Sequence, residues 1–185
     1  DIFNTKEFDE LVAGLSTLRA RAEAILNHLK RTALEKMETD PAYYRNFSQM
    51  IEETLRAIEQ ERMDELEALK FAKSLQQQET TGYRQDIPHR LRKLRDAPAY
   101  YGVVHETLKD RLSQNVLAEI ASQLETLIEH NKIRDWVDNP DVLNRMRNEI
   151  DGYLYDIEKA QQVRFSTVEL DEIIEQVIDI ARKRA

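Results

Sequence analysis

The residues that could perform metal-dependent chemistry in this 185-residue chain are its four histidines and its 35 carboxylates. A helical zinc protease needs the pattern His-Glu-x-x-His, which places two imidazoles on one helix face. The segment 105–109 reads HETLK, so Lys109 stands where the second histidine is required. A four-helix di-iron site needs a histidine three residues after a glutamate, and none of the four histidines has this spacing. The sequence therefore predicts neither of these two metal sites.

The sequence also contains no pattern for a nucleotide-binding site or for a thiol-dependent site. A phosphate-binding loop needs glycines clustered ahead of lysine and serine or threonine, whereas the four glycines of this chain are isolated. Asp64 and Glu65 open a helix and do not follow a buried strand, so they make a poor magnesium site for a motor. The chain has no cysteine. We therefore expect no catalytic residue, no metal and no cofactor in this chain.

One basic cluster is a candidate for phosphate contacts. Five bases lie within a dozen residues, namely Arg84, Arg90, Arg92, Lys93 and Arg95. Such a segment could bind DNA phosphates, because duplex affinity comes largely from neutralised phosphates. The interpretation that we favour is a solvated helix face that pairs with the excess acid of the chain, whose formal net charge is −8.

The stretch 120–155 is the one around which we expect the chain to be arranged. Its apolar residues recur at helical spacing on both sides of a short connector that carries the only tryptophan, Trp136. Asp138-Asn139-Pro140 has the residue types of a helix start, so we expect two antiparallel helices with Trp136 filling the corner between them. Arg145 and Arg147, on the second helix, could pair with nearby acids or reach the carboxylates of a partner. Their spacing does not choose between the two.

The elements that must position these residues are helices. Charged residues make up 34% of the chain and glycine and proline number four each, a composition that disfavours sheets. An unbroken stripe from Phe8 to Met37 predicts one N-terminal helix of about thirty residues. Cap-then-proline patterns predict further helix starts at Asp40-Pro41 and at Asp96-Ala97-Pro98, and Pro88 predicts a short helix over 89–95. Asp64 should cap another helix, and Ser166 with Glu169 forms a capping box for the last one.

This pattern predicts an all-α fold, a compact multi-helix bundle of about seven or eight helices. We expect a single domain over residues 1–185. The polar segment 76–82 predicts a loop and a possible internal boundary near 76–84, and the polar run 158–162 predicts a second loop.

The chain has no apolar run of the roughly 18 residues that a membrane span requires, and no signal-peptide pattern. Together with the lack of cysteine, this favours the cytoplasm and no membrane partner. The chain begins at Asp1 without methionine, so we expect it to be part of a longer protein.

Several long blocks are similar to the C-terminal helical domain of restriction subunits in type I restriction-modification enzymes. The most characteristic block reads DWVDNPDV at 135–142, followed by RMRN at 145–148 and DGYLYD at 151–156. DIFNTKEF at 1–8, EKMETDPAYY at 35–44, the segment 97–102 and the tail 171–183 also fit. The segments 76–82 and 161–164 match nothing definite, and the basic cluster is only loosely matched.

The resemblance implies a role that the residue pattern alone does not reach. Such subunits carry a nuclease and an ATP- and magnesium-dependent DNA translocase ahead of a helical tail, and this chain resembles the tail. The resemblance implies docking onto the methyltransferase and specificity subunits, with DNA reached through the parent complex. We name Trp136, Asp138, Arg145 and Arg147 as partner-binding candidates. The alternative is a DNA-contacting module that uses the basic segment 84–95.

Overall fold

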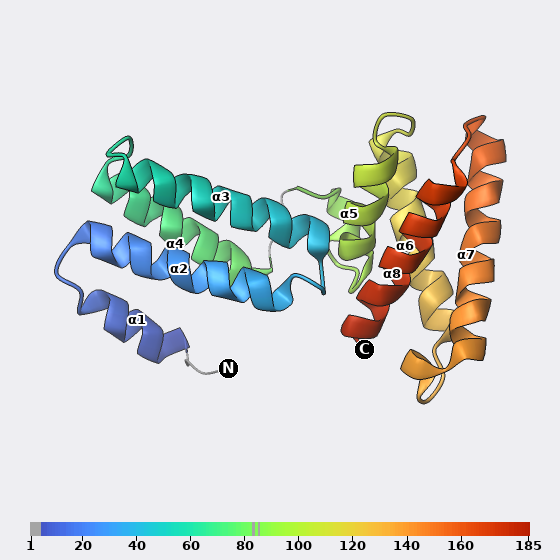
Figure 1. Ribbon diagram of the computed structural model, residues 1–185, viewed down its shortest axis with the longest axis horizontal. Coiled ribbons are helices and arrows are strands. Elements are labelled where there is room, and N and C mark those ends of the chain that lie inside the picture. The colour runs from blue at the N-terminus through green and yellow to red at the C-terminus, as the bar shows by residue number, and fades with distance from the viewer. Residues whose placement is uncertain (1–4, 83, 85) are drawn as a thin grey trace. The chain divides into compact units, whose positions relative to one another are not determined.

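The computed structural model describes residues 5–82, 84 and 86–185. Within these residues the chain forms eight α-helices, two 3-10 helices and no strand (Figure 1). The prediction of an all-α fold is therefore confirmed. Residues 1–4, which open the first block of the resemblance, lie outside the described residues.

The chain divides into two compact units. The N-terminal unit comprises Asp1–Met37 and Tyr44–Arg84, and the C-terminal unit comprises Glu38–Tyr43 and Gln85–Ala185. The connector between the second and third helices thus belongs to the C-terminal unit. The chain passes for the last time from the N-terminal to the C-terminal unit after Arg84. This point directly follows the segment 76–84, for which the sequence predicts a boundary.

The N-terminal unit is built on α2 (Leu18–Lys36) and α4 (Glu65–Thr81), together with α1 (Thr5–Ala13) and most of α3 (Pro41–Glu59). Its fully or nearly fully buried side chains include Ile25, Leu26, Leu29, Phe47, Ile51 and Leu75. These residues recur at helical spacing, so burial of one face of each helix explains the stripes in the sequence.

The expectation of one long N-terminal helix is wrong. The helix stops after Ala13 and a new one starts at Leu18. Thr17 has an extended backbone and its side chain accepts a hydrogen bond from Ala20 N at 3.0 Å, which caps α2. Glycine weakens a helix, and a threonine three residues later offers the backbone an alternative partner, so Gly14 and Thr17 together break the helix.

The predicted loop at 76–82 is also wrong for most of its length. Helix α4 continues to Thr81, and only Gly82 adopts the left-handed conformation (φ 63°) that ends a helix. Thr80 and Thr81 donate their hydroxyl hydrogen bonds to the carbonyls of Gln76 and Gln77, both at 2.8 Å. Polar residues therefore continue the helix here and do not interrupt it.

The C-terminal unit contains η1 (His89–Leu91), α5 (Ala97–Leu108), α6 (Gln114–Asn131), η2 (Trp136–Asp138), α7 (Pro140–Gln161) and α8 (Thr167–Lys183). Helix α7 runs back along α6, and α8 runs back along α7 (Figure 1). One continuous core joins these helices, with Leu117, Leu124, Ile128, Met146, Leu154 and Ile173 among its buried members.

Several predicted helix ends are confirmed in this unit. Helix α6 ends at Asn131, Asn139 caps α7 through its side chain, and the capping box of Ser166 and Glu169 is present. The predicted helix over 89–95 is shorter than expected and reduces to η1.

The predicted loop at 158–162 is wrong, because α7 continues to Gln161. Glu158 turns into the core, and its Oε1 accepts a hydrogen bond from Phe165 N at 2.6 Å. A contact with the following turn therefore explains why this polar run is helical.

Candidate functional site

Trp136, the first partner-binding candidate, is mostly buried. Its exposed fraction is 7%, and the ammonium of Lys132 lies 5.4 Å from the ring centroid. The side chain fills the corner before α7, where a turn in which Asp135 has a left-handed backbone (φ 59°) leads into η2. A partner would thus reach the edges of this corner and not the indole face.

Asp138 lies on the surface of the same corner. Its side chain is 87% exposed and pairs with Arg182, whose Nη2 lies 2.9 Å from Asp138 Oδ1. Arg182 Nε donates to the carbonyl of Val137, also at 2.9 Å. One arginine of α8 therefore braces the corner and still leaves the carboxylate accessible.

The two arginines of α7 are engaged within the chain. Arg145 Nε donates to Asn131 Oδ1 at 2.6 Å, and Asn131 Nδ2 donates to Glu149 Oε2 at 2.6 Å, which links α7 to the end of α6. Arg147 forms a two-point contact with Glu175 of α8, with distances of 2.6 and 3.0 Å. The hydrogen bonds from Arg147 lower the pKa of Glu175, because they stabilise the ionised carboxylate.

The basic segment does not form one free surface. Arg84 belongs to the N-terminal unit, whereas the other four bases belong to the C-terminal unit. Arg90 pairs with Glu119 at 3.1 Å and donates to Asn115 O, and Arg95 donates to Arg184 O at 2.7 Å. Arg92 donates to Ile87 O at 3.4 Å, and Lys93 is exposed. Two of the five bases therefore hold neighbouring helices together.

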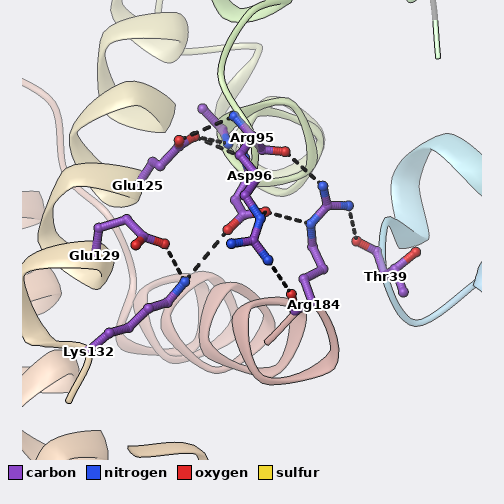
Figure 2. Close-up of polar contacts among 8 residues, drawn as sticks. Thr39, Arg95, Asp96, Glu125, Glu129, Lys132 and Arg184 are labelled. Atoms are coloured by element: carbon purple, nitrogen blue, oxygen red, sulfur yellow. Dashed lines mark hydrogen bonds and ion pairs between the residues drawn. The ribbon is translucent and has the colours of Figure 1, made fainter. Parts of the chain in front are cut away.

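A polar cluster, which we call the Asp96 cluster, contains one of the sequence candidates, Arg95, and five residues that are not among those candidates. It consists of Asp96, Arg184, Arg95, Lys132, Glu125 and Glu129 (Figure 2). Asp96 is 1% exposed, and Arg184 Nε donates to its Oδ1 at 2.7 Å. Lys132 Nζ lies 3.7 Å from its Oδ2. The positive and negative groups balance, as burial of charge requires.

Glu125 gives the cluster a second function, because it caps α5 from another helix. Its carboxylate accepts hydrogen bonds from the backbone N–H groups of Arg95, Asp96 and Ala97 at 3.2, 3.0 and 2.5 Å. The sequence predicts this helix start correctly, but the Asp96 side chain makes no capping hydrogen bond. An acid at the positive end of the helix is favourable wherever it comes from.

The cluster also holds the connector between α2 and α3, which belongs to the C-terminal unit. Arg184 Nη1 donates to Thr39 O at 3.3 Å (Figure 2). Lys183 also pairs with Glu38 at 2.6 Å. Since Arg184 also donates to Arg95 O at 2.7 Å, one guanidinium joins the connector, the start of α5 and the end of α8.

Tyr100 lies one turn after Asp96 and is fully buried. Burial raises the pKa of its hydroxyl well above the ordinary value, and the Asp96 carboxylate raises it further. Neither Tyr100 Oη nor Asp96 Oδ2 has a hydrogen-bond partner among the described residues. The tyrosine therefore stays protonated across the physiological range, and the cluster is suited to bracing helices and not to proton transfer.

In the part of the chain that the structure describes, no group of three His, Asp or Glu side chains could hold a metal ion. No helix there is long and apolar enough to cross a membrane. The chain matches no protein-family model, no curated protein and no solved structure.

Proposed function

We propose that this chain is the C-terminal interaction domain of a type I restriction subunit. It docks the ATP-dependent DNA translocase and nuclease of that subunit onto the methyltransferase–specificity core in the cytoplasm. The resemblance of the blocks 135–142, 145–148 and 151–156 supports this assignment. ATP and magnesium belong to other parts of the parent protein.

The observation that carries the proposal is the rigid corner between α6 and α7. The block with the most characteristic resemblance begins there, and Trp136, Lys132 and Arg182 brace it from inside. Its outer residues are nevertheless open to solvent, with Ile133 at 53% and the side chain of Arg134 at 95% exposure. An aliphatic residue and three charges, Arg134, Asp135 and Asp138, are thus presented on a braced backbone.

A braced backbone favours docking for an energetic reason. Ordering a loop or a long side chain on binding opposes association, so a surface that is already ordered binds more tightly for the same contacts. Arginine is also common among residues that dominate interface energy. The corner has both features, which is why we place Asp138 and its neighbours at the interface.

The test is a biosensor measurement with an immobilised methyltransferase–specificity core of a type I restriction-modification enzyme. We expect the wild-type chain to bind with a micromolar Kd or tighter. Asp138→Ala should weaken binding by about fivefold, or about 1 kcal/mol. Its pair with Arg182 is exposed, so the loss should not come from unfolding.

The matched control is Asp110→Ala, which removes another exposed carboxylate of the same unit. It should leave binding unchanged. Absence of binding by the folded wild-type chain at about ten micromolar would contradict the proposal, because a stable interface gives a lower Kd.

Direct DNA contact through the segment 84–95 is the weaker alternative. Arg90 pairs with Glu119, and Arg95 donates to Arg184 O. A duplex would have to replace these internal contacts, so the contacts favour docking over DNA binding.

A further inference from the structure

The C-terminal end of α7 and the turn into α8 enclose a groove of about 320 Å³. We call it the α7 groove. It is lined by Tyr155, Glu158, Lys159, Gln162, Val163 and Arg164. The groove lies at the opposite end of α7 from the Trp136 corner, about 30 Å away along a helix of 22 residues. It is therefore a separate surface of the same unit.

Two cations, Lys159 and Arg164, line the groove. Among the described residues, neither Lys159 nor the side chain of Arg164 forms an ion pair. Glu158 also lines the groove, but it is buried and accepts the backbone N–H of Phe165. The groove thus presents two exposed cations beside one another, and its one carboxylate is buried. They favour a ligand that supplies a negative group.

The groove has an apolar wall beside these charges. Tyr155 is 51% exposed. The Lys159 ammonium lies over its ring, 4.0 Å from the centroid. Val163 is half-buried and completes this wall. A ligand would thus meet an aromatic ring and an aliphatic side chain next to two positive charges. This combination fits a carboxylate that sits beside an aliphatic or aromatic group.

The groove is held in shape from behind. Gln162 has a left-handed backbone, and Val163 N donates to Glu158 O at 3.1 Å, which closes the end of α7. Arg111 Nη1 donates to the carbonyl of Arg164 at 2.8 Å, and Phe165 is buried under the same guanidinium. These contacts use the backbone of residue 164, so its side chain is available for binding.

We infer that the α7 groove binds a segment of a partner protein that carries an aspartate or glutamate next to an apolar side chain. This inference rests on the proposed docking function and places a second contact with the methyltransferase–specificity core. The charge of the whole chain disfavours nucleic acid as the occupant, because a net charge of −8 repels a polyanion.

The experiment compares two double variants of the full chain. Lys159→Glu with Arg164→Glu reverses the charge of the groove, and Lys70→Glu with Lys109→Glu makes the same change in net charge at exposed lysines elsewhere. Circular dichroism and thermal unfolding establish first that both variants fold. On the biosensor with the immobilised core, we expect the groove variant to bind about tenfold more weakly and the control variant to change by less than about twofold.

The other two outcomes contradict either the groove inference alone or both the groove inference and the docking function. If the wild-type chain and the groove variant bind the core equally, the groove inference is wrong and the docking function stands. If the wild-type chain does not bind the core, both are wrong.

Two further measurements test other occupants. Fluorescence anisotropy uses a single-stranded oligothymidine of about 20 nucleotides. Tight binding that the groove variant loses would identify nucleic acid as the occupant and overturn the inference. Sedimentation that shows a dimer of the wild-type chain, absent in the groove variant, would identify a second copy and overturn it equally.

Discussion

Asp96 illustrates how much one side chain can contribute when its charge is buried. Its carboxylate is almost inaccessible, and Arg184, Lys132 and Arg95 supply the positive charges around it. A buried ion pair adds little compared with apolar packing, but removal of one partner leaves the other charge buried and uncompensated. The cost of a substitution therefore depends on burial and not on the number of ion pairs.

Asp96→Asn should lower the free energy of unfolding by about 3 kcal/mol, because Arg184 then loses its buried counter-charge. Urea denaturation followed by circular dichroism measures the change. The control is Asp138→Asn, which removes an exposed pair with Arg182 and should cost less than about 1 kcal/mol. Equal losses in the two variants would show that the Asp96 cluster does not brace the unit.

Glu169 gives a pH dependence with a defined sign. Hydrogen bonds from Arg111 and from Ser166 lower the pKa of its carboxyl from 4.5 to about 2. The folded state therefore favours the ionised form. The resulting stabilisation is fully present above about pH 4.5 and is lost as the pH falls towards 2.

Glu169→Gln should thus be less stable than the wild-type chain at neutral pH, and the difference should shrink between about pH 4.5 and pH 2. Urea denaturation at several pH values tests this. A difference that stays constant down to the acid limit would mean that the hydrogen bonds to Glu169 do not favour its ionised form.

At the scale of elements, the start of α5 shows that a helix can be capped from outside its own sequence. Glu125 on α6 accepts three backbone N–H groups there. Asp96, which stands at the cap position, directs its carboxylate to Arg184 instead. The capping acid and the capped helix thus come from different elements, and their packing joins α5 to α6.

The close contact between Gly102 and Ala42 leads to a second prediction at this scale. A Cβ added at Gly102 of α5 would lie 2.6 Å from the Cβ of Ala42, which belongs to the same C-terminal unit. Gly102→Ala should therefore destabilise the protein by about 1–3 kcal/mol. Thermal or urea unfolding measures the effect.

Gly152 is the matched control on α7, because a Cβ there meets nothing within 4 Å. Gly152→Ala should stabilise the protein by about 0.5–1 kcal/mol through helix propensity alone. The opposite signs expected for the same substitution separate packing from propensity. If both variants gained stability, the contact between Gly102 and Ala42 would not be close.

At the scale of the whole molecule, net charge governs which polymers approach the chain. A formal charge of −8 opposes DNA, and the bases of the segment 84–95 partly serve internal contacts. We expect duplex binding weaker than about 10⁻⁴ M at physiological salt, at the weak limit of non-specific binding. A mobility-shift assay with the purified chain checks this.

Lys93→Glu reverses an exposed base of that segment and serves as the companion variant. Like the wild-type chain, this variant should give no mobility shift. Micromolar binding that falls steeply with salt and disappears in this variant would instead support the DNA-contacting alternative.

The sequence predicts the helices well where local contacts decide them. The caps at Asp64, Asn139 and Ser166 form within a few residues of the helices that they start, and apolar stripes report one buried face. The sequence does not predict the break at Gly14–Thr17, because an intact apolar stripe continues across it. It does not predict the helical ends of α4 and α7 either, because their residues are polar; side-chain hydrogen bonds within α4 and a buried Glu158 stabilise them.

The all-α class and most helix starts can be predicted from the sequence, because they depend on neighbours within one or two turns. Which charges meet depends on how the helices pack. Arg184 and Asp96 are 88 residues apart, and Glu125 caps a helix that begins 28 residues before it. Each of these groups has many possible partners among the charged residues of the chain. Packing alone selects one of them, since only the folded chain brings the groups within hydrogen-bond distance in a place from which water is excluded.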